Sequence, residues 1–244
     1  MRSSNPALKK AFADSYYAQG ADVMTVKGAV DKSFLLILIV LAGAAISWTL
    51  ITGGMVPAQP LLIGTGIAGF ILAMITIFKT GIAKYTAPLY AFIEGLFLGG
   101  ITLFFEMMMP GIAFQAVGLT LGVFICMLVA YKTGVIKASE GFRAGLMAAT
   151  GAVALVYVIS MVMGLFGIQM PYIHESGLIG IGFSVVVVVI AALNLVLDFA
   201  FIEEGAAMGA PKNMEWYAAF SLLITLVWLY LEILRLLSKL ASRD

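Results

Sequence analysis

The chain contains seven long runs of apolar residues, separated by short segments that hold glycine, proline and most of the charged residues. We expect helices at about 34–52, 60–79, 85–109, 113–131, 144–165, 177–202 and 215–238. Runs of about 19 to 26 residues can cross a hydrocarbon core of roughly 30 Å at 1.5 Å per residue. They are too long and too uniformly apolar for the strands of a β-barrel. The sequence therefore predicts an all-α polytopic membrane protein with seven transmembrane helices.

Composition excludes several classes of protein. The chain is 62% hydrophobic and 11% charged, whereas a soluble domain has about 25% charged residues. The formal net charge of +1 gives no reason to expect a nucleic-acid partner. With Cys126 as the one cysteine and His174 as the one histidine, neither an internal disulfide nor a Cys/His zinc site is expected. Nothing in the sequence indicates a cofactor.

The charged residues suggest the domain boundaries and the orientation. We expect a polar cytoplasmic tail at 1–33, a transmembrane domain at 34–238 and a short C-terminal tail at 239–244. Lys and Arg number five in 1–33, none in 53–59, two in 79–84, none in 106–112, three in 132–143, none in 166–176 and one in 203–214. This alternation predicts a multi-pass protein of the plasma (inner) membrane with a cytoplasmic N-terminus.

The C-terminal end breaks this alternation. Arg235, Lys239 and Arg243 would face outward after seven crossings. Either the last helix crosses against the rule, or it enters the membrane and returns without a full crossing. We favour seven crossings.

Small residues recur at the spacing that lets membrane helices approach closely. Gly95 and Gly99 form one GxxxG pair, and Gly118 and Gly122 form another. Such faces serve either packing within the bundle or a dimer interface. Packing within the bundle is the expected use here, and the oligomeric state stays open.

Ionisable residues inside membrane spans are costly, so they are the best functional candidates. Glu94 lies in the middle of the third expected helix, Asp198 near the cytoplasmic end of the sixth and Glu232 far along the seventh. Each has a structural alternative. Glu94 would be a protonated acid bonded within the bundle, Asp198 would reach interfacial water, and Glu232 would pair with Arg235 one turn on.

No enzyme is expected. A serine hydrolase needs a base beside its nucleophile, but His174 falls in an outer loop and neither Ser160 nor Ser184 has an evident partner. No phosphate-binding glycine loop is present. A retinal-binding protein needs a lysine in the middle of its last helix, and Lys239 lies at the very end.

Three stretches together resemble the Bax inhibitor, or transmembrane Bax inhibitor motif, family, and in particular its bacterial YccA-like members. They are YAFIEGLFLGGITL at 90–103, DFAFI at 198–202 and LYLE at 229–232. The resemblance implies six helices packed around a central seventh. It also implies a calcium-permeable, pH-sensitive leak, which in the family is gated by two aspartates on the last two helices and a basic latch residue.

Carried over to this chain, the resemblance assigns roles to four residues. Asp198 matches the sixth-helix aspartate, and Glu232 stands where the family has the seventh-helix aspartate. Lys79, with Lys84 as the alternative, stands near the latch arginine, and a lysine lacks the bidentate fork of arginine. Lysines at such a junction also commonly extend to the lipid headgroups, which is the structural alternative.

The expected function is therefore a pH-sensitive leak for calcium or other cations across the lipid bilayer, gated by carboxylates inside the membrane. Asp198 and Glu94 are candidate transient calcium contacts, because calcium prefers oxygen ligands. The alternative is a regulator of a membrane-bound protease or other partner protein, acting through the tail without transport of its own. The mixed charges of the tail do not decide between the two.

Overall fold

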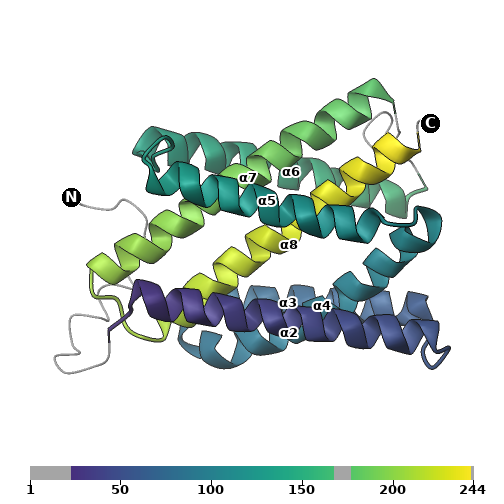
Figure 1. The fold of residues 1–244 in the computed structure, drawn as a ribbon, viewed down its shortest axis with the longest axis horizontal. Helices are drawn as coiled ribbons and strands as arrows, with labels where there is room; N and C mark the ends of the chain where they lie inside the picture. Colours follow the sequence, from purple (N-terminus) through teal and green to yellow (C-terminus); the bar gives the residue numbers. More distant parts are fainter. Residues whose placement is uncertain (1–22, 168–176, 243–244) are drawn as a thin grey trace. The chain divides into compact units, whose positions relative to one another are not determined.

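A computed structural model describes residues 23–167 and 177–242 (Figure 1). Most of the expected tail and His174 lie outside these ranges. The helices are α2 (Val26–Thr52), α3 (Ala58–Phe78), α4 (Ala83–Met108), α5 (Ile112–Lys132), α6 (Glu140–Leu165), α7 (Leu178–Ala207) and α8 (Met214–Ala241), with a short 3₁₀ helix, η2 (Thr80–Ile82), before α4. All seven long helices are long and apolar enough to span a membrane, which confirms the predicted fold class.

The first helix begins at Val26 and not at residue 34. Thr25 caps it, since its side chain accepts a hydrogen bond from the Gly28 N–H at 3.0 Å. Lys27, Asp31 and Lys32 fall within its first two turns, and these charges conceal the helix from a hydropathy pattern. The other boundaries lie within five residues of those expected.

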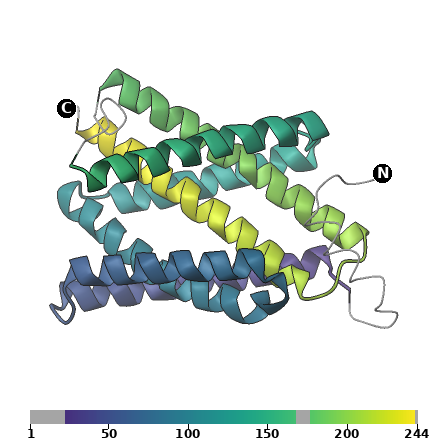
Figure 2. The same cartoon turned by 180° about the vertical axis from the view of Figure 1, so that it is seen from behind.

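The chain divides into two compact units. The first comprises Met1–Gly100 and Ala200–Leu223, and the second comprises Ile101–Phe199 and Ile224–Asp244. Each unit therefore combines segments that are far apart in the sequence, and α4, α7 and α8 contribute to both. Figure 2 shows the helices from behind, coloured along the sequence. In these three helices half of the most apolar window is buried, against 22% or less in the others. The last helix thus shares its high burial with α4 and α7.

In the first unit, α2 and α4 pack backbone against backbone. A Cβ atom on Gly95 would lie 2.3 Å from the carbonyl oxygen of Val40, and one on Gly99 would lie 2.4 Å from that of Ala44. Gly43 of α2 makes the reciprocal approach, 2.6 Å from the carbonyl oxygen of Phe92. Since no real Cβ contact is this short, only glycine fits at these positions. The Gly95/Gly99 pair therefore serves packing within the bundle.

The second GxxxG pair behaves differently. Cβ atoms on Gly118 and Gly122 of α5 would meet nothing within 4 Å among the described residues. The same motif therefore marks a tight helix contact in α4 and an open face in α5.

The first unit is closed by a carboxylate at the start of α8. Glu215 is fully buried and accepts hydrogen bonds from the Thr25 N–H at 2.9 Å and the Thr25 hydroxyl at 3.0 Å. It also forms an ion pair with Lys32. The negative carboxylate lies beside the first turn of α2, where the helix dipole favours it. Next to it, the Met24 N–H donates to the Ala210 carbonyl at 2.7 Å.

The orientation can be tested with reporter fusions. A reporter fused after Gly111, between α4 and α5, is expected to read external or periplasmic. One fused after Lys137, between α5 and α6, is expected to read cytoplasmic, because residues 132–143 hold three basic residues and residues 106–112 hold none. Alkaline phosphatase and a fluorescent protein report the two sides, and the same compartment for both fusions would contradict seven crossings.

Candidate functional site

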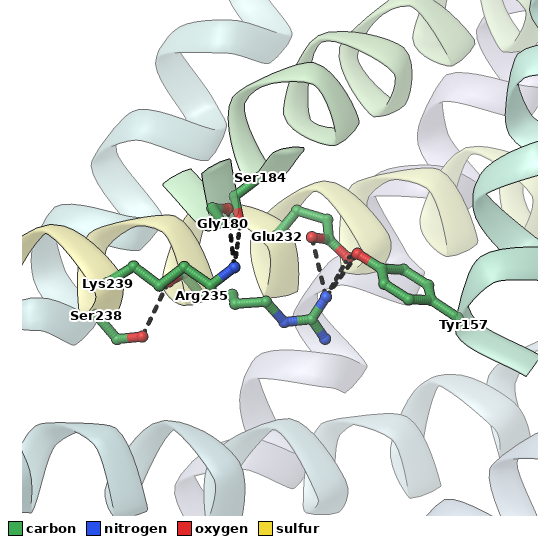
Figure 3. A network of polar contacts seen from close by, with 7 residues as sticks. All are labelled: Tyr157, Gly180, Ser184, Glu232, Arg235, Ser238 and Lys239. Carbon is green, nitrogen blue, oxygen red and sulfur yellow. Dashed lines mark hydrogen bonds and ion pairs between the residues drawn. The ribbon is translucent and has the colours of Figure 1, made fainter. Parts of the chain in front are cut away.

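A network of polar side chains lies inside the second unit, around Glu232 of α8 (Figure 3). The Glu232 residue is 2% exposed. Its Oε1 and Oε2 accept hydrogen bonds from Arg235 Nη1 at 3.0 and 3.1 Å. Because the two residues lie three apart on one helix, they meet on the same face. The structural alternative expected from the sequence, a local ion pair, is therefore present.

A third group completes this arrangement. The Tyr157 hydroxyl of α6 donates to Glu232 Oε1 at 2.9 Å and accepts from Arg235 Nη1 at 2.6 Å. The Arg235 guanidinium also lies 5.0 Å from the centroid of the Tyr157 ring, within range of a cation–π interaction. The three groups thus form a closed cluster, hereafter the Glu232 cluster, in which α6 and α8 are linked.

One turn further along α8 is a buried lysine. Lys239 is 5% exposed, and its ammonium donates to the Gly180 carbonyl at 3.0 Å and to the Ser184 hydroxyl at 2.9 Å, both in α7. The sequence analysis began the C-terminal tail at residue 239, but α8 includes Lys239, and the residue is buried. The helix continues to Ala241, and the first turns of α7 supply oxygens that hold the ammonium.

The Lys239 contacts also set the register of the second-unit parts of α7 and α8, which run in opposite directions (Figure 1). Lys239 is level with Gly180 and Ser184. Glu232 lies seven residues before Lys239, about 10 Å back along α8. Asp198 lies 14 residues beyond Ser184, about 21 Å along α7. By this rise the two acids sit at levels about 10 Å apart along the helices. Their pairing stays a prediction.

Asp198 is buried nevertheless, with 7% of its surface exposed. The next residue, Phe199, packs against the rings of Phe124 and Tyr131 of α5, with centroids 5.7 and 5.8 Å away. Asp198 therefore occupies an interior position and not an open helix end. This burial favours a functional role over the alternative of a carboxylate in interfacial water.

Glu94 belongs to the first unit and is 9% exposed. Tyr90, one turn earlier on α4, donates a hydrogen bond to its carboxylate. A Cβ atom on Gly69 of α3 would lie 3.0 Å from Glu94 Oε2, so the carboxylate fills the space above this glycine. Tyr90 itself packs edge-on against Phe220, at 5.1 Å between centroids. The side chain is thus held between α3 and α4.

The two candidate latch residues are both exposed. Lys79 follows the end of α3, and Lys84 lies in the first turn of α4, with its ammonium 4.7 Å from the centroid of the Tyr85 ring. Both belong to the first unit, whereas Asp198 belongs to the second. Their exposure agrees with the alternative of lysines that extend to the headgroups. The latch stays a prediction.

The sequence did not predict that Tyr157 and Ser184 take part in this network, nor that Lys239 is buried. Only the Glu232 and Arg235 pairing is local enough to be predicted from spacing. The partners from α6 and α7 lie more than fifty residues away in the chain. Within 23–167 and 177–242, no group of three or more His, Cys, Asp or Glu residues is arranged to hold a metal ion.

The chain was compared with known proteins. No curated protein was found to match it. The model of the family described as "Bax inhibitor 1 like" matches residues 5–242, which is almost the whole chain. The three stretches that suggested this family lie in α4, α7 and α8, the helices that also carry Glu94, Asp198 and Glu232. The chain therefore belongs to the Bax inhibitor 1 like family.

Proposed function

We propose that this protein is a passive, pH-sensitive leak for cations, with calcium as its physiological ion. One observation carries the proposal: α4, α7 and α8 each hold a buried acidic residue within a helix of membrane-spanning length. These residues are Glu94, Asp198 and Glu232. Membership of the Bax inhibitor 1 like family supports the same proposal, because the resemblance of the three stretches implies a calcium leak.

The chemistry of such carboxylates suits a pH-sensitive cation leak. Calcium prefers oxygen ligands, which carboxylates and hydroxyls such as that of Tyr157 provide. An acidic residue inside a membrane span is costly to keep and is commonly part of an ion pathway. Protonation removes the charge that attracts a cation, so a leak through carboxylates responds to pH.

Calcium flux into liposomes that contain the purified protein tests this function. An internal calcium dye reports flux over a range of pH, and protein-free liposomes give the background. Deleting residues 1–22 is the matched variant, because it spares Thr25 and Lys32, which hold Glu215. A leak should survive this deletion. Flux equal to the background at every pH would reject the leak and favour the regulator of a membrane protease, which should depend on the deleted tail.

Glu94→Gln is expected to lower calcium flux by about tenfold, the change produced by roughly 1.4 kcal/mol. The amide keeps the shape and can still accept the Tyr90 hydrogen bond, so the fold should be retained, but it carries no charge to stabilise a passing cation. Glu140→Gln is the control, because Glu140 is exposed in the first turn of α6. Wild-type flux in Glu94→Gln at every pH would return Glu94 to a purely structural role.

A further inference from the structure

The Glu232 carboxylate already holds a cation, which is the guanidinium of Arg235. We propose that Arg235 is a resident cation that occupies the ion position at Glu232 and must leave it before a permeating cation can bind there. This proposal rests on the proposed leak and adds its regulation by a residue on the same helix. It does not involve Lys79, Lys84 or a pairing with Asp198.

The first support is that Arg235 is bound in the way a small cation would be. Its Nη1 contacts both oxygens of Glu232 and the Tyr157 hydroxyl, at 2.6 to 3.1 Å. Three oxygen atoms thus converge on one nitrogen. Hydroxyl and carboxylate oxygens are also the ligands that a hard cation prefers.

The second support is the difference in exposure across the pair. The Arg235 side chain is 38% exposed, whereas that of Glu232 is 2% exposed. The guanidinium is therefore the accessible member, and the carboxylate is the shielded one. Among the described residues, the hydrogen bonds of the guanidinium all use Nη1, so the group is anchored through one of its nitrogens. A change of side-chain rotamer would uncover Glu232 without any movement of α8.

The third support is the link to another helix. Tyr157 comes from α6 and bonds to both members of the pair. A shift of α6 relative to α8 would remove the Tyr157 hydroxyl from the guanidinium and weaken its hold. Tyr157 therefore couples the position of α6 to the release of Arg235.

Removal of the guanidinium tests the proposal. Arg235→Ala is expected to raise calcium flux about tenfold in liposomes. In detergent, calcium should raise the thermal midpoint of Arg235→Ala and leave that of the wild type unchanged, because ligands that bind only the folded state stabilise it. The double variant Glu232→Gln with Arg235→Ala is the control and should show neither effect.

Chemical rescue distinguishes an occupied ion site from a purely structural ion pair. Guanidinium chloride at millimolar concentration should return the flux of Arg235→Ala toward the wild-type rate and compete with calcium in the thermal measurement. It should do neither in the double variant. If Arg235→Ala fails to fold, Arg235→Lys replaces it, since an ammonium is a more strongly hydrated point charge and lacks the planar group that lies over the Tyr157 ring. Calcium should then displace the lysine and shift the midpoint.

The outcomes separate this proposal from the leak itself. One outcome would overturn the role of Arg235 and leave the leak intact. In it the wild-type protein conducts calcium, Arg235→Ala and Arg235→Lys conduct it at the same rate, and calcium does not shift the thermal midpoint of either variant. A Glu232-dependent calcium shift in Arg235→Ala without flux in any variant would support the ion site and reject the leak. Guanidinium effects that are equal in the single and double variants would also overturn the proposal.

Discussion

Gly95→Ala is expected to destabilise the protein by more than about 2 kcal/mol, although it adds a single methyl group. The new Cβ would lie 2.3 Å from the carbonyl oxygen of Val40, and that atom belongs to the backbone of α2. Neither helix can relieve the overlap by a side-chain rotation. The two helices must separate and lose the close contact that Gly43 and Gly99 also make.

Gly118→Ala is the matched control for this substitution, because it changes the same motif where a Cβ meets nothing within 4 Å among the described residues. It should be neutral or slightly stabilising, since alanine favours a helix by up to about 1 kcal/mol over glycine. Unfolding in mixed micelles with increasing dodecyl sulfate measures both variants. Equal stability of Gly95→Ala and Gly118→Ala would contradict the close packing of α2 on α4.

Glu215→Ala is expected to cost about 3 to 5 kcal/mol, the range for breaking a buried ion pair from one side. The substitution leaves the Thr25 N–H, the Thr25 hydroxyl and the Lys32 ammonium without their acceptor at the start of α2. It also removes a negative charge from the positive end of the α2 dipole. Glu140→Ala is the control, because Glu140 is also a first-turn glutamate but is exposed.

Unfolding in mixed micelles measures the loss, and hydrogen exchange locates it. Amides in the first two turns of α2 should exchange faster in Glu215→Ala, while those of α5 should change less. A double variant, Lys32→Met with Glu215→Leu, should recover part of the stability, because an apolar pair leaves no buried charge. An unchanged unfolding curve for Glu215→Ala would show that the anchor carries no net stability.

The long helices were predictable because their signal is local. Runs of apolar residues identify a membrane span without knowledge of its neighbours. The start of α2 was missed for the opposite reason. Its first turns carry Lys27, Asp31 and Lys32, which interrupt the apolar run. Glu215, far along the chain, stabilises this end of the helix, because it accepts a hydrogen bond from the Thr25 N–H and forms an ion pair with Lys32.

The two GxxxG pairs show a second limit. Both have the same spacing, yet Gly95 and Gly99 are in close contact and Gly118 and Gly122 are open. What separates them is whether a partner helix presents small residues at the same level, as α2 does with Gly43 and Ala44. That pairing is a property of the fold and not of either motif.

The candidate site was predictable only in its local part. The acids Glu94, Asp198 and Glu232 were identified from charge inside apolar runs, and all three are buried. A hydropathy pattern ends the last span before Lys239, because the charge of the residue counts against membrane burial. The pattern does not include the Gly180 and Ser184 oxygens that bind the ammonium in the folded protein. Long-range polar contacts of this kind carry no sequence period.

The Glu215 anchor has a consequence for biosynthesis. It joins residues 190 positions apart, and the unit that it closes needs residues 200–223 as well as the first hundred. A chain that emerges from the ribosome N-terminal end first will insert α2, α3 and α4 long before Glu215 exists. Until then, the amino end of α2 lacks its acceptor, and Lys32 lacks its counter-ion. Assembly of the first unit is therefore completed only after α8 has been translated, because a chain that stops before α8 lacks the Glu215 carboxylate.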